Sequence, residues 1–316
     1  MNDVLHTVFS VALIAATLTY LTPILFASIG GAITQQGDIL NIGLEGMMLI
    51  GAFSAIAVGA AANNALVGVL AAVLSSLLLS AIYAVFTLWL KADFIVVGIG
   101  VNMLAAGASV FALQLLYGNP GGTPQSVRSS LPKFTVPGDA TLRYWFDHGQ
   151  GGFLGQQTPL VYVALLSVPL YAFLLYRTRY GVHLRAVGQD LPAAIAAGIN
   201  ATRVKLISIL LCGVLTGLAG AQLSMANLGS FNQGMSSGRG FIAVAALTFG
   251  RAKPVPTLVA AVIFGLADAM ADRLGVAGIN SNLAKMAPYI ITIVALTLAS
   301  MDLFARRRKA AALKTA

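Results

Sequence analysis

Long, continuous apolar runs dominate the chain, and within them apolar and polar positions do not alternate. Because a helix rises 1.5 Å per residue, about 20 apolar residues suffice to cross a bilayer. A transmembrane β-barrel would instead show regular alternation. The pattern therefore predicts an all-α fold, a polytopic transmembrane helix bundle with about 8–10 membrane elements. The expected spans are residues 8–33, 42–62, 66–90, 94–117, 160–176, 204–227, 255–271 and 287–304.

Two Gly-rich stretches interrupt this pattern and predict broken or re-entrant elements. Residues 240–250 are apolar but too short to cross alone, so they need the Gly/Ser-rich residues before them or form a re-entrant element. Residues 37–46 are their rough counterpart in the first half of the chain. Paired interruptions in two halves are typical of transport sites built from discontinuous helices, although no residue-level repeat supports this pairing.

The composition agrees with a membrane protein. Of the 316 residues, 58% are hydrophobic and 9% are charged, whereas a soluble domain carries about 25% charged residues. The formal net charge of +9 is not gathered on one solvated face, so it indicates membrane topology and no nucleic-acid partner. We expect a single transmembrane domain over residues 1–316.

Basic residues group in four regions, which we assign to the cytoplasmic side. These regions are Lys91, residues 177–205, residues 250–256 and the tail at 305–316. Loops rich in Lys and Arg stay on that side. The number of membrane crossings between the four regions allows this if the 231–250 segment crosses once. The segment 118–157, rich in Gly, Pro and polar groups, then forms an external loop. This arrangement has about nine crossings and places the N-terminus outside and the C-terminus inside.

Polar side chains inside the apolar segments are candidates for function. Asn41 and Glu45 are four residues apart and share one helical face. A carboxylate near the bilayer centre costs at least about 2.5 kcal/mol, so Glu45 should face protein or water. It either lines a solute path or lies at a helix N-terminus, satisfied by backbone N–H groups. Asn102, an amide within the fourth span, either bonds a neighbouring helix or lines the same path.

Motifs that carry chemistry are absent from the sequence. There is no G-x-x-x-x-G-K-[ST] nucleotide loop, no H-E-x-x-H and no Cys/His cluster, so we expect no cofactor, no metal site and no catalytic residues. Embedded acids are few, namely Glu45 and Asp268, which argues against an ion-coupled carrier. The chain is then a channel or the pore-forming partner of a separate subunit that supplies the energy for transport, and not an enzyme.

Four segments resemble one family of membrane proteins. They are residues 37–53 (GDILNIGLEGMMLIGAF), 185–199 (RAVGQDLPAAIAAGI), 213–221 (GVLTGLAGA) and 238–250 (GRGFIAVAALTFG). In their order and spacing they resemble the permease subunits of bacterial ABC importers for simple sugars and nucleosides, the family that includes the ribose permease. The chain looks most similar to the shorter of two paired nucleoside permeases, and the resemblance covers residues 21–304.

This resemblance implies a multi-subunit importer in the bacterial inner membrane. An extracytoplasmic solute-binding protein would deliver the solute, and two permease subunits, this one and a longer paralogue, would form the path. Two cytoplasmic ATPase subunits would drive the cycle by docking on cytoplasmic loops, while the basic tail contacts anionic membrane lipid. The residues expected at the ATPase contact are Arg185, Gly188, Arg251, Lys253 and Pro254.

The resemblance also implies a neutral solute, a nucleoside or a simple sugar, which needs no fixed counter-charge along its path. The residues expected to line that path are Asn41, Glu45, Asn102 and Gln222. Other interpretations are a stand-alone secondary transporter or channel for a small neutral solute, which would work without ATP, and a non-transporting scaffold. The sequence does not decide between a sugar and a nucleoside.

Overall fold

The computed structural model describes residues 11–133, 157–226 and 229–276, and the secondary structure of this part is helical. An isolated β-bridge joins Gly122 to Asn232. The helices are α2 (Val11–Gln36), α3 (Leu44–Ala61), α4 (Ala65–Ala84) with the π-helical η1 (Val85–Trp89), α5 (Phe94–Tyr117), α8 (Pro159–Arg177), α9 (Arg179–Gln189), α10 (Leu191–Ala196), α11 (Ala201–Met225), α12 (Arg239–Phe249) and α13 (Pro254–Val276).

Seven of the described helices are long and apolar enough to cross a membrane, which confirms the predicted polytopic bundle. They correspond to the first seven spans expected from the sequence, and α12 is a shorter apolar helix, as the interrupted segment 240–250 predicts. The eighth expected span at 287–304, the tail at 305–316 and residues 134–156 of the expected external loop lie outside the described residues.

Polar residues mark where several helices begin. Asp93 precedes α5, and its Oδ1 accepts hydrogen bonds from the N–H groups of Ile95 at 2.9 Å and Val96 at 3.0 Å. Asn64 and Asn200 cap α4 and α11 in the same way. These side chains satisfy N–H groups that have no acceptor within the first turn of a helix. They explain why new helices start sharply between neighbouring apolar runs.

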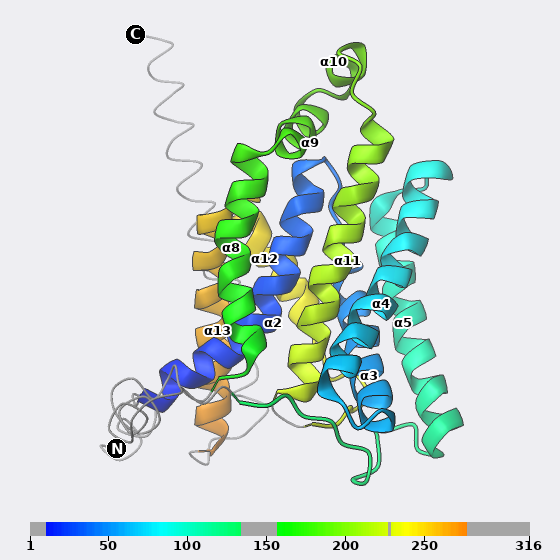
Figure 1. Cartoon of the computed structure of the whole chain (residues 1–316), viewed down its shortest axis with the longest axis vertical. Helices are drawn as coiled ribbons and strands as arrows, with labels where there is room; N and C mark the ends of the chain where they lie inside the picture. The colour runs from blue at the N-terminus through cyan, green and yellow to red at the C-terminus, as the bar shows by residue number, and fades with distance from the viewer. Residues whose placement is uncertain (1–10, 134–156, 227–228, 277–316) are drawn as a thin grey trace.

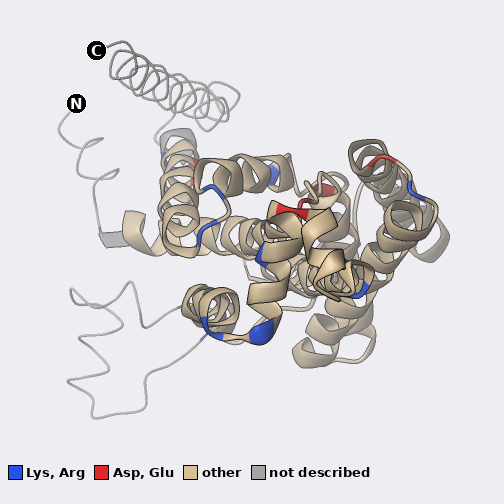
Figure 2. Ribbon diagram, turned by 90° about the horizontal axis from the view of Figure 1, so that it is seen from above, with Lys and Arg blue, Asp and Glu red and all other residues tan. Residues whose placement is uncertain are grey.

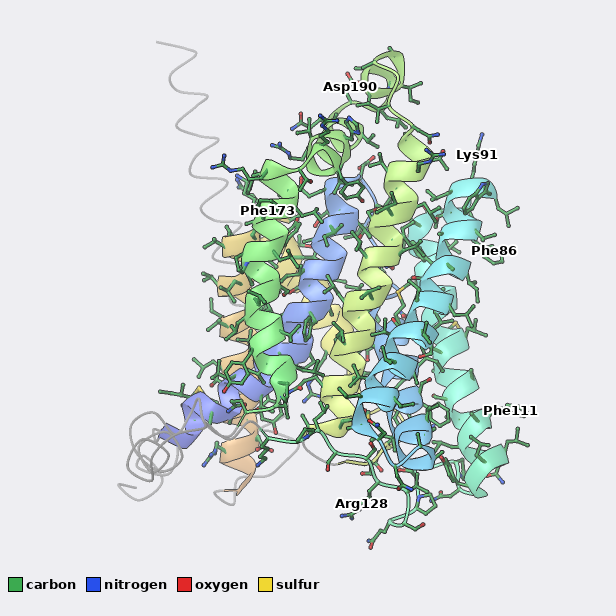
Figure 3. All side chains as sticks on the ribbon, viewed as in Figure 1. Phe86, Lys91, Phe111, Arg128, Phe173 and Asp190 are labelled. Atoms are coloured by element: carbon green, nitrogen blue, oxygen red, sulfur yellow. The ribbon has the colours of Figure 1, made fainter. Side chains whose placement is uncertain are left out.

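Helices α2 and α11 lie side by side at the centre of the bundle (Figure 1). α11 also packs on α3 and α4, whereas α8, α12 and α13 contact α2, and α5 packs against α3 at the edge. The side chains of Phe86, Phe111 and Phe173 point away from the bundle (Figure 3) and are 45%, 69% and 58% exposed. Apolar outer faces of this kind are typical of helices that contact lipid.

Glycines let α11 approach its neighbours closely, and Gly213 and Gly217 have the small-xxx-small spacing that is typical of close helix contacts. A Cβ built on Gly217 would lie 2.7 Å from the carbonyl oxygen of Ala72 and 2.7 Å from Cα of Val73 on α4. A Cβ on Gly220 would collide with the backbone of α3. Because these contacts are made by backbone atoms, a larger residue can be accommodated only if the helices move apart.

We expect Gly217→Ala to lower the free energy of unfolding by roughly 1–3 kcal/mol, because the added methyl group overpacks a backbone contact. Denaturant unfolding in mixed micelles measures the change. Gly107→Ala on α5 is the matched control, since nothing lies within 4 Å of a Cβ built there and alanine is the better helix former. Equal stabilities of the two variants would contradict this packing.

Basic residues from several segments of the chain lie at one end of the bundle. Lys91 and Asp190 lie at the end that carries α9 and α10, and Arg128 lies at the opposite end (Figure 3). Figure 2 looks down on the former end, where blue Lys and Arg segments are spread over several helices. Arg185 and Arg251 also lie there, around one pocket. Three of the four regions predicted to be cytoplasmic therefore share this end, which we call the basic end.

Candidate functional site

The chain turns back into the bundle between α2 and α3, where the sequence predicts a re-entrant element. Asp38 adopts a positive φ of 60° at this turn, and α3 begins only at Leu44. Asn41 is 1% exposed. Its Oδ1 accepts a hydrogen bond from the Gly43 N–H at 2.9 Å and so holds the turn. Its Nδ2 lies 3.5 Å from the sulfur of Cys212 on α11. The Asn41 side chain thus fixes the backbone of the turn against α11.

Asn102 on α5 holds both sides of the start of α3. Its Oδ1 accepts a hydrogen bond from the Gly46 N–H at 2.7 Å, and its Nδ2 donates to the carbonyl oxygen of Ile42 at 3.0 Å. The Gly46 N–H lies in the first turn of α3, where a helix offers no acceptor of its own. Asn102 therefore forms the interhelical hydrogen bonds that were one of its two predicted roles.

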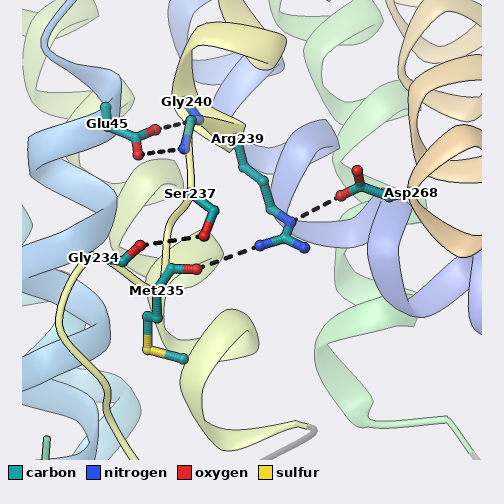
Figure 4. A network of polar contacts seen from close by, with 8 residues as sticks. Glu45, Gly234, Met235, Ser237, Arg239, Gly240 and Asp268 are labelled. Atoms are coloured by element: carbon teal, nitrogen blue, oxygen red, sulfur yellow. Dashed lines mark hydrogen bonds and ion pairs between the residues drawn. The ribbon is translucent and has the colours of Figure 1, made fainter. Parts of the chain in front are cut away.

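Glu45 joins the start of α3 to the start of α12 (Figure 4). Its Oε1 accepts a hydrogen bond from the Gly238 N–H at 2.8 Å, and its Oε2 accepts one from the Gly240 N–H at 2.6 Å. A Cβ on Gly240 would lie 2.5 Å from the backbone N of Glu45, so only glycine permits this approach. The carboxylate lies at the N-terminal ends of two helices, and both helix dipoles stabilise its negative charge.

An ion pair on the other side of α12 was not predicted from the sequence. Arg239, the first residue of α12, donates from Nε to Oδ2 of Asp268 on α13 at 2.9 Å, and the two side chains are 18% and 11% exposed. Its Nη1 donates to the carbonyl oxygen of Met235 at 3.4 Å, and its guanidinium lies 5.7 Å from the ring centroid of Tyr20 on α2. An embedded acid needs a partner, so Asp268 indicates a nearby cation, but this rule does not identify Arg239.

Gln222 lies apart from these residues. It is 1% exposed, and its Oε1 accepts a hydrogen bond from Oγ1 of Thr158 at 2.8 Å, while its Nε2 has no partner in the described part of the chain. Cys212 is the α11 residue that contacts Asn41, and Gln222 is about 15 Å further along the same helix. The structure therefore brings together three of the four residues expected on the path, and not the fourth.

The residues around the two helix breaks form one connected group, which we call the break cluster. It comprises Asn41, Glu45, Asn102, Arg239 and Asp268. The cluster supplies amide groups, helix N-termini and the Glu45 carboxylate, whose charge is balanced by two backbone N–H groups. Inside an apolar bundle, these groups can exchange hydrogen bonds with a polar solute. Within the described ranges, no group of three or more His, Cys, Asp or Glu residues could hold a metal ion.

The residues expected at the ATPase contact meet at the basic end. Arg185 and Gly188 on α9 and Arg251 in the turn between α12 and α13 surround one pocket. Lys253 is exposed in the same turn, and Pro254 is buried at the start of α13. Two segments that are far apart in sequence therefore form one surface at this end.

The turn between α12 and α13 is held by two other helices. Arg251 and Ala252 both adopt positive φ, 49° and 52°. The carbonyl oxygen of Ala252 accepts hydrogen bonds from Nε2 of Gln36 at 2.9 Å and from the Tyr171 hydroxyl at 2.7 Å. These bonds attach the turn to the end of α2 and to α8, so its backbone has a fixed place in the bundle.

Helix α10 protrudes from the basic end (Figure 1) and presents apolar side chains that the sequence analysis did not single out. Leu191 and Ile195 are 39% and 57% exposed. Asp190 caps the helix, because its Oδ1 accepts a hydrogen bond from the Ala193 N–H at 3.0 Å. Tyr180 of α9 donates to a backbone carbonyl of α11, and burial raises the pKa of its hydroxyl, which keeps it a donor. The capped Asp-Leu-Pro start of α10 is the signal that could have found it.

Replacing Gly188 with alanine is expected to displace α9 from the end of α2, because the new Cβ would collide with the carbonyl oxygen of Gln36. Overpacking of this kind costs roughly 1–3 kcal/mol. Since Gly188 lies outside the spans, we expect normal membrane insertion but a lower uptake rate in the assembled complex. His183→Ala, an exposed position on the same helix, is the control. Unchanged uptake by the Gly188 variant would argue against a role for this contact.

Comparisons with known proteins agree on the class of the chain. Residues 13–296 match the family model described as the permease component of the branched-chain amino acid transport system. The chain is 34% identical over 297 residues to the nucleoside ABC transporter permease NupC of Lactococcus lactis, covering 90% of this chain and 91% of that one. It is 32% identical over 302 residues to the guanosine ABC transporter permease NupQ of Bacillus subtilis, with the same coverage.

A more distant relative is the ribose import permease RbsC of Escherichia coli K12, which is 27% identical over 271 residues, 83% of each chain. These matches span almost all of the described residues, and they confirm that the chain is a transport subunit and not an enzyme. The chain belongs to the family of permease components of branched-chain amino acid transport systems.

Proposed function

We propose that this chain is the membrane-path subunit of an ATP-driven importer for nucleosides. The observation that carries the proposal is the break cluster, where two interrupted helices meet at a polar site inside an apolar bundle, a geometry typical of solute sites in transporters. Similarity to a nucleoside permease and a guanosine permease over 90% of the chain supports nucleosides. The ribose permease is the more distant relative, which makes a simple sugar the second candidate.

The solute passes beside the break cluster in this proposal. Glu45 and Asn102 are partly exposed, whereas Asn41 is buried and shapes the backbone of the turn. The charge of Glu45 is already balanced by two backbone N–H groups, so a neutral nucleoside would meet no isolated charge. Gln222 is buried as well and lies apart from this site, nearer the end of the bundle opposite to the basic end.

The energy for transport comes from other subunits, because the sequence holds no nucleotide-binding loop. The basic end faces the cytoplasm of a bacterial cell, with the C-terminus on that side. There, α10 and the pocket residues contact one of the two ATPase subunits. A second permease, a longer paralogue, completes the path, an extracytoplasmic solute-binding protein delivers the nucleoside, and the basic tail contacts anionic lipid.

The test compares liposomes that contain this chain alone with liposomes that contain the complete complex of two permeases, ATPase subunits and binding protein. We expect uptake of labelled guanosine only by the complete complex and only with ATP. Unlabelled nucleosides should compete, and ribose should not. Transport by the chain alone would instead support the stand-alone transporter or channel, and competition by ribose alone would support a sugar importer.

A further inference from the structure

A polar pocket opens at the basic end between the end of α2, α9 and the turn between α12 and α13. Its volume is about 330 Å³. Its walls include Gln35, Arg185, Gly188, Gln189, Thr248 and Arg251. The residues come from three helices, α2, α9 and α12, and from the turn after α12, so the pocket exists only in the folded bundle.

The walls of this pocket are built from fixed backbone. The turn that carries Arg251 is held through the carbonyl oxygen of Ala252, which accepts hydrogen bonds from α2 and α8. Gly188 lies directly against the carbonyl oxygen of Gln36, with no room for a side chain between α9 and α2. A pocket whose walls are fixed in advance loses little conformational entropy when a partner binds.

Two guanidinium groups face this pocket without an acidic partner among the described residues. Arg185 is positioned by its Nε, which donates to the carbonyl oxygen of Gly181 at 3.4 Å, and by the ring of Tyr176, 5.5 Å from its guanidinium carbon. Among the described residues, its Nη atoms make no hydrogen bond, and Arg251 makes none through its side chain. Asp38, an exposed acid at this end, does not line the pocket. The pocket is therefore prepared for an anionic group.

A second unpartnered atom points to the kind of partner. Oε1 of Gln35 is buried at the pocket and accepts no hydrogen bond from any residue that the structure describes. A buried acceptor of this kind needs an N–H or O–H donor. The phosphodiester of a lipid would supply acceptors for the arginines but no donor for Gln35. A protein segment with an acidic side chain supplies both, the carboxylate for Arg185 and Arg251 and a backbone N–H for Gln35.

We propose that an aspartate or glutamate of the ATPase subunit inserts into this pocket and pairs with Arg185 and Arg251. The inference rests on the proposed function, which places an ATPase at the basic end. It adds a specific ionic contact next to the exposed apolar residues of α10, Leu191 and Ile195. The apolar tip and the charged pocket together would fix both the position and the orientation of the ATPase on the permease.

The experiment measures the affinity of the purified ATPase subunit for the permease pair in nanodiscs of neutral lipid. Arg185→Glu, Arg251→Glu and the double variant are compared with Arg203→Glu, an exposed basic residue at the same end outside the pocket. We expect each pocket variant to bind at least about tenfold more weakly, about 1.4 kcal/mol, and the double variant more weakly still. Lysine substitution of a single ATPase acid should restore binding to Arg251→Glu. Thermal melting checks that all variants are folded.

Unchanged affinity of the folded double variant would overturn the inference, as would an equal loss in Arg203→Glu, which would indicate a diffuse electrostatic effect. A loss that appears only when anionic lipid is present would assign the pocket to a lipid headgroup instead. The wild-type complex separates this inference from the proposed function. If the wild type binds no ATPase and takes up no nucleoside, the proposed function fails. If the wild type binds the ATPase and takes up nucleoside, and the pocket variants bind the ATPase equally well, only the pocket contact is overturned.

Discussion

Asp268→Leu is expected to destabilise the bundle by about 3–5 kcal/mol, because it leaves the Arg239 guanidinium buried without a counter-charge. The two side chains are 18% and 11% exposed, and no other acid pairs with Arg239 in the described part of the chain. A charge in an apolar helix bundle has no water to replace its lost partner. Denaturant unfolding in mixed micelles should show the loss, and uptake by the assembled complex should fall with it.

The double variant Arg239→Met with Asp268→Leu is the control for this prediction. Replacing a buried ion pair by apolar residues of similar volume is often neutral, so the double variant should recover most of the stability lost by the single one. Recovered stability with reduced uptake would mean that the pair positions α12 for transport. If Asp268→Leu alone were as stable as the wild type, the ion pair would not contribute as the contacts indicate.

The break cluster and the pocket are connected through one structural unit, the hairpin of α12 and α13. At the basic end, the turn of this hairpin is attached to α2 and α8 through the carbonyl oxygen of Ala252. About 16 Å away along α12, Arg239 attaches the start of the helix to α13, and Glu45 attaches it to α3. A displacement of the turn by a bound partner would therefore reach the break cluster through a short, rigid helix.

Hydropathy predicts the depth of a segment in the membrane but not the direction in which its side chains point. The seven spans and the short α12 follow from length and apolar content. The break before α3 also follows, because Gly37, Asp38 and Gly43 favour a turn over a continuous helix. Gln222 shows the limit, since an amide in an apolar span predicts a polar neighbour without identifying it, and that neighbour is Thr158 rather than the break cluster.

The pairing of Arg239 with Asp268 required the packing of α12 on α13, which the sequence alone does not supply. The two residues are 29 positions apart and belong to different elements. The hydrogen bonds of Glu45 are similar, because their donors at Gly238 and Gly240 are more than 190 positions away along the chain. Contacts at such separations depend on the arrangement of the whole bundle, whereas the helix caps at Asp93 and Asp190 are local and readable from the sequence.

Glu45→Gln is expected to release the start of α12 from α3 and to lower uptake by the assembled complex on the order of tenfold or more. The carboxylate accepts hydrogen bonds from two backbone N–H groups, at 2.8 and 2.6 Å, whereas an amide has one acceptor oxygen and must direct its NH2 group toward the other donor. Each lost bond to a charged group costs about 1.5–3 kcal/mol. The variant also loses the favourable interaction with the two helix dipoles.

Asp38→Asn is the matched control for this prediction. It makes the same change from carboxylate to amide in the same re-entrant stretch, at an exposed position whose positive φ of 60° asparagine tolerates. We expect it to retain stability and uptake. Glu45→Asp separates charge from reach, because its shorter side chain keeps the charge but cannot contact both N–H groups, so it should also transport poorly. Full uptake by Glu45→Gln would show that the bond between α3 and α12 is not needed for transport, and the break cluster would then lose its central contact.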